Sequence, residues 1–260
     1  MGWLVGGSIQ DATVARAGPV MIIAMVIFAS AFGVISLPDS PGPHMETPEE
    51  KAARLSGKVA KDPYSPLSFR HFVLGAIAIF FYVGIEVGIP NTANVYFSGL
   101  SDVGPALTGT LISAYWLCML AGRLIGASIG GKVSSKNMLL YTSSAAIVLI
   151  LLAIFIPESV AIGKLPVSLL FLALCGLCTS VMWGAIFNLS AEGLGKYTAA
   201  ASGIFMTLVC GGGIIPFIQN ALADAVGSLQ SHWALILCLA YLIFYALVGS
   251  KNVNKDIPTE

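Results

Sequence analysis

The sequence predicts an all-α polytopic membrane protein, and three observations carry that prediction. The chain of 260 residues is 57% hydrophobic and only 10% charged, with a mean hydropathy of +0.87. Soluble domains carry about 25% charged residues. Apolar runs recur at lengths near the ~20 residues that cross a bilayer as a helix. Lipid cannot satisfy backbone polar groups, so spans of this length must be helical.

The N-terminal residues 1–37 form the first element. A short apolar stub, Trp3 to Ile9, precedes an expected transmembrane helix at 19–37. The stub is too short to cross a bilayer, so it is either an interfacial segment or the end of an earlier helix. It lacks a basic start and a long apolar centre, which argues against a signal peptide.

Residues 38–70 form the second element, a polar linker. It opens with the run P-D-S-P-G-P and continues with many charged residues. Its middle part starts Thr-Pro-Glu-Glu at Thr47, which suits a short surface helix. We expect the linker to separate two domains, with the boundary near residue 70.

Six closely spaced spans follow the linker. We expect them at 72–97, 106–128, 138–156, 166–189, 198–222 and 232–249. The connections between them are short. Residues 71–250 are therefore predicted to form one six-helix bundle, preceded by a single transmembrane helix and followed by a tail over 251–260.

The basic residues predict the orientation of these spans, because Lys and Arg remain on the cytoplasmic side. With the linker inside, only Arg16 and Lys164 of the thirteen basic residues fall outside. The bundle should then begin and end in the cytoplasm. Seven spans put the N-terminus outside, and with the half-helix stub this suggests the second part of a longer transporter.

Several function classes find no support in the sequence. It contains no P-loop, G-x-S-x-G, H-E-x-x-H or dinucleotide fingerprint. We expect no enzyme activity, no cofactor, no metal site and no nucleic-acid partner. Cys175 and Cys178 have the C-x-x-C spacing, but their apolar helix offers no His or acid nearby. Buried thiols acting as small hydrophobic groups are the better interpretation.

The most informative polar residue is Glu86, an acid deep in a span. Such residues are costly in lipid and usually face a bundle interior or an aqueous cavity. Tyr82, Glu86 and Pro90 share one helix face, and Asn91 and Asn94 follow. Pro90 can open the helix locally, as in many substrate sites. The alternative is that Glu86 bonds a neighbouring helix and only fixes packing.

Aromatic and amide side chains on two later spans extend this candidate site. Tyr115 lies midway along one span, while Trp183 and Asn188 lie on another. Aromatic planes beside amides suit sugar recognition, because ring faces stack on the sugar and amides bond its hydroxyls. The alternative for each tryptophan is a lipid-facing or core position.

Small residues mark the span 198–222, where Gly203, Gly211 and Gly212 occur. Small residues allow membrane helices to approach closely, so we assign these three to helix packing. We also expect Pro216 to kink the outer part of this span.

Arg123 and Glu192 fall at predicted cytoplasmic helix ends. At one membrane level they could form an ion pair that latches a cytoplasmic gate. The alternative is that each side chain simply extends to the membrane interface.

Three sequence stretches resemble a known family. Six-helix blocks that begin and end inside resemble half of a major facilitator superfamily transporter, and G-R-L-I-G-A-S-I-G-G-K-V-S-S-K looks like that superfamily's loop motif. The stretches F-Y-V-G-I-E-V-G-I and I-F-N-L-S-A-E-G-L-G-K-Y-T-A-A-A-S-G resemble helix 7 and helices 10 to 11 of the fucose/galactose/glucose–proton symporter family. Where members often have Pro-Thr, this chain has Trp183-Gly184.

The resemblance implies a proton-coupled sugar importer of the bacterial inner membrane that works by alternating access. This chain would supply helices 6 to 12, so its partners would be a first bundle, the lipid bilayer, a sugar and H⁺. The proton-coupling acids of the family lie in that first bundle. A transporter of a non-sugar solute, such as an organic acid or drug-like molecule, and a non-transporting membrane protein or remnant remain as alternatives.

Overall fold

The computed structural model describes residues 25–26, 63–100, 103–157, 159–254 and 256–259. Within these ranges, six helical spans are long and apolar enough to cross a membrane, which confirms the predicted fold class. They cover Arg70–Ser98, Gly104–Ile129, Ser135–Phe155, Val167–Ala191, Gly195–Val226 and Gln230–Gly249. The expected helix at 19–37 and the linker lie almost wholly outside the described residues, so the domain limits stay predictions.

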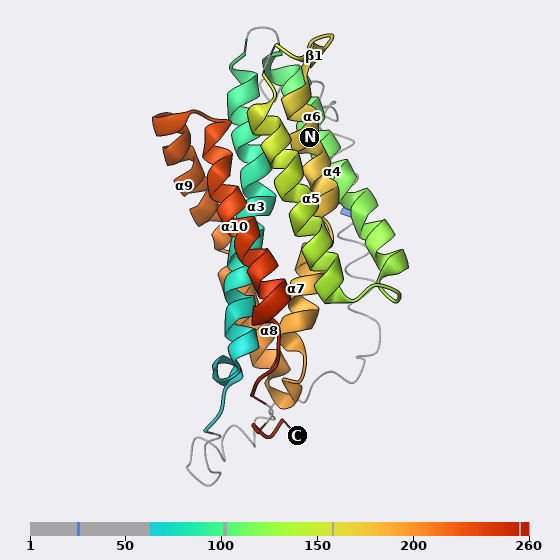
Figure 1. Ribbon diagram of the computed structural model, residues 1–260, viewed down its shortest axis with the longest axis vertical. Helices are drawn as coiled ribbons and strands as arrows, with labels where there is room; N and C mark the ends of the chain where they lie inside the picture. Colours follow the sequence, from blue (N-terminus) through green and yellow to red (C-terminus); the bar gives the residue numbers. More distant parts are fainter. Residues whose placement is uncertain (1–24, 27–62, 101–102, 158, 255, 260) are drawn as a thin grey trace.

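The first of these spans, α3 (Arg70–Ser98), is the central helix of the bundle. It packs against α4, α6, α7, α8, α9 and α10, and Figure 1 shows it running along almost the whole bundle. In its most apolar window 61% of the residues are buried, compared with 22% for Gly104–Ile129. Among the six described spans, α4 (Gly104–Ile129) therefore has the smallest buried share.

Two short connections join α4, α5 and α6. Helix α5 (Ser135–Phe155) begins after Ser134, whose hydroxyl accepts a hydrogen bond from the Asn137 N–H at 3.3 Å. After α5 the chain forms a small hairpin of β1 (Ala161–Ile162) and β2 (Leu165–Pro166). Gly163 turns this hairpin with a φ of +67°, a conformation that favours glycine.

The fourth and fifth spans are each interrupted. The fourth consists of α6 (Val167–Thr179) and α7 (Met182–Ala191). The fifth consists of η3 (Gly195–Tyr197), α8 (Thr198–Leu208) and α9 (Gly211–Val226). The interruptions lie at 180–181 and 209–210, whereas α3 continues through Pro90 and α9 through Pro216. The expected helix opening at Pro90 is thus not present as a break.

The last span begins with η4 (Gln230–His232), continues as α10 (Trp233–Phe244) and ends in a π-helical turn, η5 (Tyr245–Gly249). The segment after it returns to the start of α3. There the side-chain oxygen of Asn254 accepts a hydrogen bond from the Arg70 N–H at 2.9 Å. This contact satisfies one of the backbone donors that a helix start leaves unpaired.

The three glycines assigned to packing differ in their surroundings. A Cβ on Gly211 would overlap the backbone of Phe80 in α3, and one on Gly212 would press against Val83. Gly203 is exposed, and a Cβ there would meet nothing within 4 Å. The packing assignment of Gly203 is therefore wrong within the described chain, because α8 turns that face away from its neighbours.

The two ends of the bundle carry different charges. Lys132, Lys136, Lys196 and Lys251 lie at or beside helix ends on the side of the bundle where α3 begins, which we call the basic end. Helix α3 begins towards the bottom of Figure 1. Lys164 lies at the opposite end, in the turn of the β1–β2 hairpin. Cys175 and Cys178 are free and buried in α6, as expected for thiols that pack as hydrophobic groups.

Candidate functional site

An ion pair between two helices forms the centre of the candidate site. Nη2 of Arg123 in α4 lies 3.4 Å from Oε1 of Glu86 in α3. The Glu86 side chain is 15% exposed and the Arg123 side chain 56%. An arginine at this depth is costly in lipid, so its exposed guanidinium should face water or a polar partner. The pair thus marks the face of the bundle at which a solute could bind.

Tyr115 holds the same glutamate by its backbone. Its hydroxyl donates a hydrogen bond to the Glu86 carbonyl oxygen at 3.0 Å, and it lies 3.2 Å from the hydroxyl oxygen of Thr179. Tyr115 is 1% exposed. The structure therefore places Tyr115 beside Glu86, but the Tyr115 hydroxyl is already engaged with protein groups.

Two aromatic rings complete this cluster. The ring of Tyr82, one turn before Glu86, lies 6.1 Å from the ring of Trp183 at an angle of 63°. Tyr82 is fully buried, whereas Trp183 at the start of α7 is half-buried. We refer to Tyr82, Glu86, Tyr115, Arg123, Thr179 and Trp183 together as the central cluster.

The expected amides lie away from the central cluster. Asn91 is half-buried and Asn94 exposed, more than one turn beyond Glu86 along α3. The side-chain oxygen of Asn94 accepts a hydrogen bond from the Ser98 hydroxyl at 3.5 Å. These two residues extend the polar face of α3 towards the opposite end of the bundle.

Asn188 lies on the other side, towards the basic end. Its side-chain nitrogen donates to the Ser135 hydroxyl oxygen at 3.5 Å. It lines two pockets. One, of about 230 Å³, also contains Arg123, and the other, of about 780 Å³, contains Glu192. Asn188 therefore connects the region of the ion pair with the basic end.

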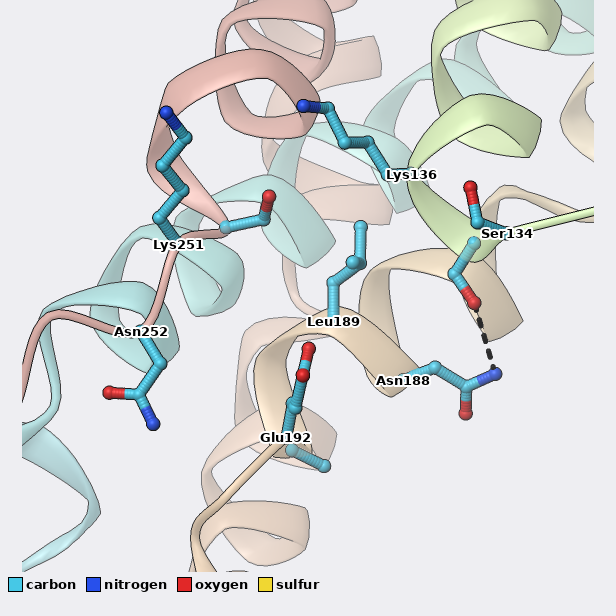
Figure 2. A pocket seen from close by; sticks show the side chains of 10 residues that line it. Ser134, Lys136, Asn188, Leu189, Glu192, Lys251 and Asn252 are labelled. Atoms are coloured by element: carbon cyan, nitrogen blue, oxygen red, sulfur yellow. Dashed lines mark hydrogen bonds between the residues drawn. The ribbon is translucent and has the colours of Figure 1, made fainter. Parts of the chain in front are cut away.

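Figure 2 shows the larger pocket at the basic end. Asn188 of α7 and Glu192, the residue after α7, lie on one side, and Lys136 and Lys251 lie across from Glu192. Ser134 and Asn252 also line it. The side chains come from three separate segments of the chain, so the pocket is a polar recess between helix ends.

The expected partner of Arg123 is wrong in this structure. Arg123 pairs with Glu86, while Glu192 is exposed at the end of α7. The reason is depth: Arg123 lies six residues before the end of α4 at Ile129, so its side chain reaches a carboxylate inside the bundle. Charges attract more strongly there than at the wet helix end.

Two contacts of the central cluster were missed from the sequence. The first is the contact of the Thr179 hydroxyl with the Tyr115 hydroxyl. A hydropathy pattern does not distinguish Thr179 from the other small polar residues of these spans. The Tyr115 bond to Glu86 did leave a signal, because Pro90 lies four residues after Glu86 and cannot donate to its carbonyl.

Comparisons with known proteins agree on one family. The profile of the Major Facilitator Superfamily matches residues 1–217. The chain is 32% identical over 234 residues to the glucose/galactose transporter of Brucella abortus, covering 89% of this chain and 52% of that protein. It is 24% identical to the L-fucose-proton symporter of Escherichia coli, over 91% of this chain and 50% of that protein.

The fold has a counterpart among solved structures. The crystal structure of the transporter FucP in the outward conformation matches with a TM-score of 0.68 at 19% identity. The match covers 94% of this chain and 57% of that one. This chain spans about half the length of the curated relatives that it matches.

Proposed function

The chain belongs to the major facilitator superfamily, and from that premise we propose that it is part of a sugar transporter. The proposed substrate is a hexose or deoxyhexose, carried by alternating access together with a proton. The 32% identity to a glucose/galactose transporter over 89% of the chain is the observation that carries the proposal. The proton rests on the weaker similarity to the L-fucose-proton symporter.

The central cluster supports a sugar-binding role chemically. Trp183 is partly exposed and offers an aromatic ring on which the C–H face of a sugar can stack. Beside it, Glu86 and the exposed guanidinium of Arg123 can bond hydroxyl groups. We propose that Asn91, Asn94 and Asn188 line the same pathway above and below this level, while the buried Tyr82 ring packs behind Trp183.

A first bundle is the proposed partner of this chain. The matched relatives are about twice as long, and most of the α4 surface is uncovered here. Trp116, Leu117 and Leu120 of α4 are 45%, 65% and 56% exposed. Such an apolar helix face suits another helix bundle or lipid.

The proposed location is a bacterial inner membrane, with the basic end and the C-terminus in the cytoplasm. Four of the described lysines lie at the basic end and one lies at the other. This distribution follows the rule that Lys and Arg remain inside.

An uptake assay tests the proposed function. The protein in its natural full length would be reconstituted in liposomes and supplied with labelled glucose, galactose or fucose, with and without an inward proton gradient. We expect uptake of at least one of these sugars, stimulated by the gradient. No binding and no uptake of any of them would overturn the sugar assignment.

A second candidate substrate is an organic acid, and Arg123 is the observation that favours it. Its side chain is 56% exposed, and a guanidinium binds carboxylates with two parallel hydrogen bonds. A labelled hexuronic acid therefore belongs in the same assay. Uptake of the acid without any neutral hexose would select this candidate.

A further inference from the structure

Pro90 leaves one backbone carbonyl of α3 without its helical partner. In an α-helix the carbonyl of residue 86 accepts from the N–H of residue 90, but proline has no N–H. Helix α3 nevertheless continues through Pro90 to Ser98. The Glu86 carbonyl lies against the buried side chain of Tyr115, so its replacement donor has to come from the protein.

Tyr115 is that donor. Its hydroxyl lies 3.0 Å from the Glu86 carbonyl oxygen, and its side chain is 1% exposed. The Thr179 hydroxyl lies 3.2 Å from the same Tyr115 oxygen and 3.3 Å from the carbonyls of Cys175 and Gly176. A chain of hydroxyl groups thus connects α6, α4 and α3 at the level of Glu86.

Helix α4 holds Glu86 at two points. Tyr115 binds the backbone carbonyl, and Arg123, two turns further along α4, binds the carboxylate. In an α-helix carbonyls point towards the C-terminal end and side chains lean towards the N-terminal end. Helices α3 and α4 are consecutive and run in opposite directions. Tyr115 therefore binds Glu86 from the side of the C-terminal end of α3, and Arg123 binds it from the side of the N-terminal end.

We infer that Tyr115 supplies the hydrogen bond that Pro90 removes and thereby positions Glu86 for its pair with Arg123. Tyr115 is then a positioning residue rather than a group that touches the substrate, which revises its sequence-based assignment. The bond itself is independent of the substrate. Only the consequence for uptake rests on the proposed function.

A double-mutant cycle of Tyr115→Phe and Pro90→Ala isolates this bond. In the natural chain, Tyr115→Phe should lower the ratio of folded to unfolded protein about threefold to twentyfold, the range for hydrogen bonds between membrane helices. In a Pro90→Ala chain the new N–H serves the Glu86 carbonyl, so the same substitution should cost less than half as much in free energy. The ratio is measured by denaturant titration of the full-length protein in mixed micelles.

Tyr241→Phe is the matched control. The Tyr241 hydroxyl also donates to a carbonyl of α3, that of Leu74, at 3.0 Å. Residue 78 is an alanine, so the Leu74 carbonyl keeps its helical N–H as well. The cost of Tyr241→Phe should be the same with Pro90 and with Pro90→Ala.

Hydrogen exchange and uptake provide readouts that a general loss of stability does not imitate. Tyr115→Phe should accelerate amide exchange locally, at residues 86–94, and Pro90→Ala should reverse this. Where the natural protein takes up a sugar, Tyr115→Phe should raise the KM threefold or more with a smaller change in maximal rate. Pro90→Ala should again restore it.

Equal costs of Tyr115→Phe in both backgrounds would overturn the inference. If Tyr115→Phe fails to accumulate, recovery of folded protein by added Pro90→Ala is the expected result. The inference would be contradicted if neither Tyr115→Phe nor Tyr115→Phe/Pro90→Ala accumulates while Tyr241→Phe accumulates normally. If the natural protein takes up no sugar, the proposed function is refuted. The double-mutant cycle still tests the Tyr115 bond, because it measures stability and not uptake.

Discussion

Glu86 and Arg123 carry opposite charges in spans that are otherwise almost uncharged, and each depends on the other. Two ions are costly inside a membrane protein unless they are paired. The Glu86 side chain is mostly buried, and the Arg123 side chain is more than half exposed. The pair is therefore both a packing contact between α3 and α4 and an available charged surface.

Glu86→Gln should remove the counter-charge of Arg123. We expect the free energy of unfolding to fall by about 1 kcal/mol, less than for a fully buried pair, because exposure of Arg123 screens the interaction. Uptake should fall at least tenfold if the charged surface contacts the solute. Denaturant titration and the liposome assay measure the two effects.

The double variant Glu86→Gln/Arg123→Gln should be less destabilised than the sum of the single variants. Glu192→Gln is the control, because this carboxylate is exposed and Arg123 pairs elsewhere. Its stability should remain within about 0.5 kcal/mol of the natural protein. An equal effect of both glutamate substitutions would show that the ion pair has no special role.

At the scale of helices, the contact between α3 and α9 depends on a glycine. Gly211→Ala would press a methyl group into the backbone of Phe80, so we expect a loss of about 1–3 kcal/mol in unfolding free energy. Gly203→Ala enters open space in α8 and should be neutral or stabilising by up to about 1 kcal/mol. Denaturant titration of the two variants under one condition measures both changes. The helix propensity changes equally in both, so a difference between them reports the packing at Gly211.

The positions of the six helical spans could be predicted from hydropathy, because each span must cover the same hydrocarbon thickness. The breaks at 180–181 and 209–210 could not, since prolines were the expected cause and both breaks lie elsewhere. The contact between Tyr115 and Glu86 could not be predicted from hydropathy either, because the two residues lie on different spans with a loop between them. Only the antiparallel packing of α3 and α4 brings the two together.

The same limit applies to the rest of the candidate site. Tyr82, Glu86 and Trp183 could be predicted as site residues, because a polar or aromatic side chain in an apolar span stands out by its residue type alone. The partner of Arg123 could not be predicted, because it depends on how far each side chain lies from the ends of the bundle. Its position in the sequence groups Asn188 with Trp183, whereas in the structure it lines one pocket that includes Arg123 and a second one at the basic end.

For the whole molecule, the charge difference between the two ends predicts a fixed orientation. We expect Lys164→Cys, beside the hairpin, to react with a membrane-impermeant maleimide on intact cells. Lys136→Cys, at the basic end, should react only after the cells are opened. The unsubstituted protein gives the background from its own five cysteines, and the reverse labelling pattern would invert the proposed topology.

The contact between Tyr115 and the Glu86 carbonyl also has an evolutionary consequence. By the inference above, a proline at position 90 costs less stability in a chain that already has a hydroxyl at position 115, which predicts that the tyrosine was acquired first. Ancestral sequences should then contain Tyr115 with a non-proline residue at 90, and the reverse combination should be rare. The inference thus predicts a one-way dependence between these two positions rather than a pair that varies freely.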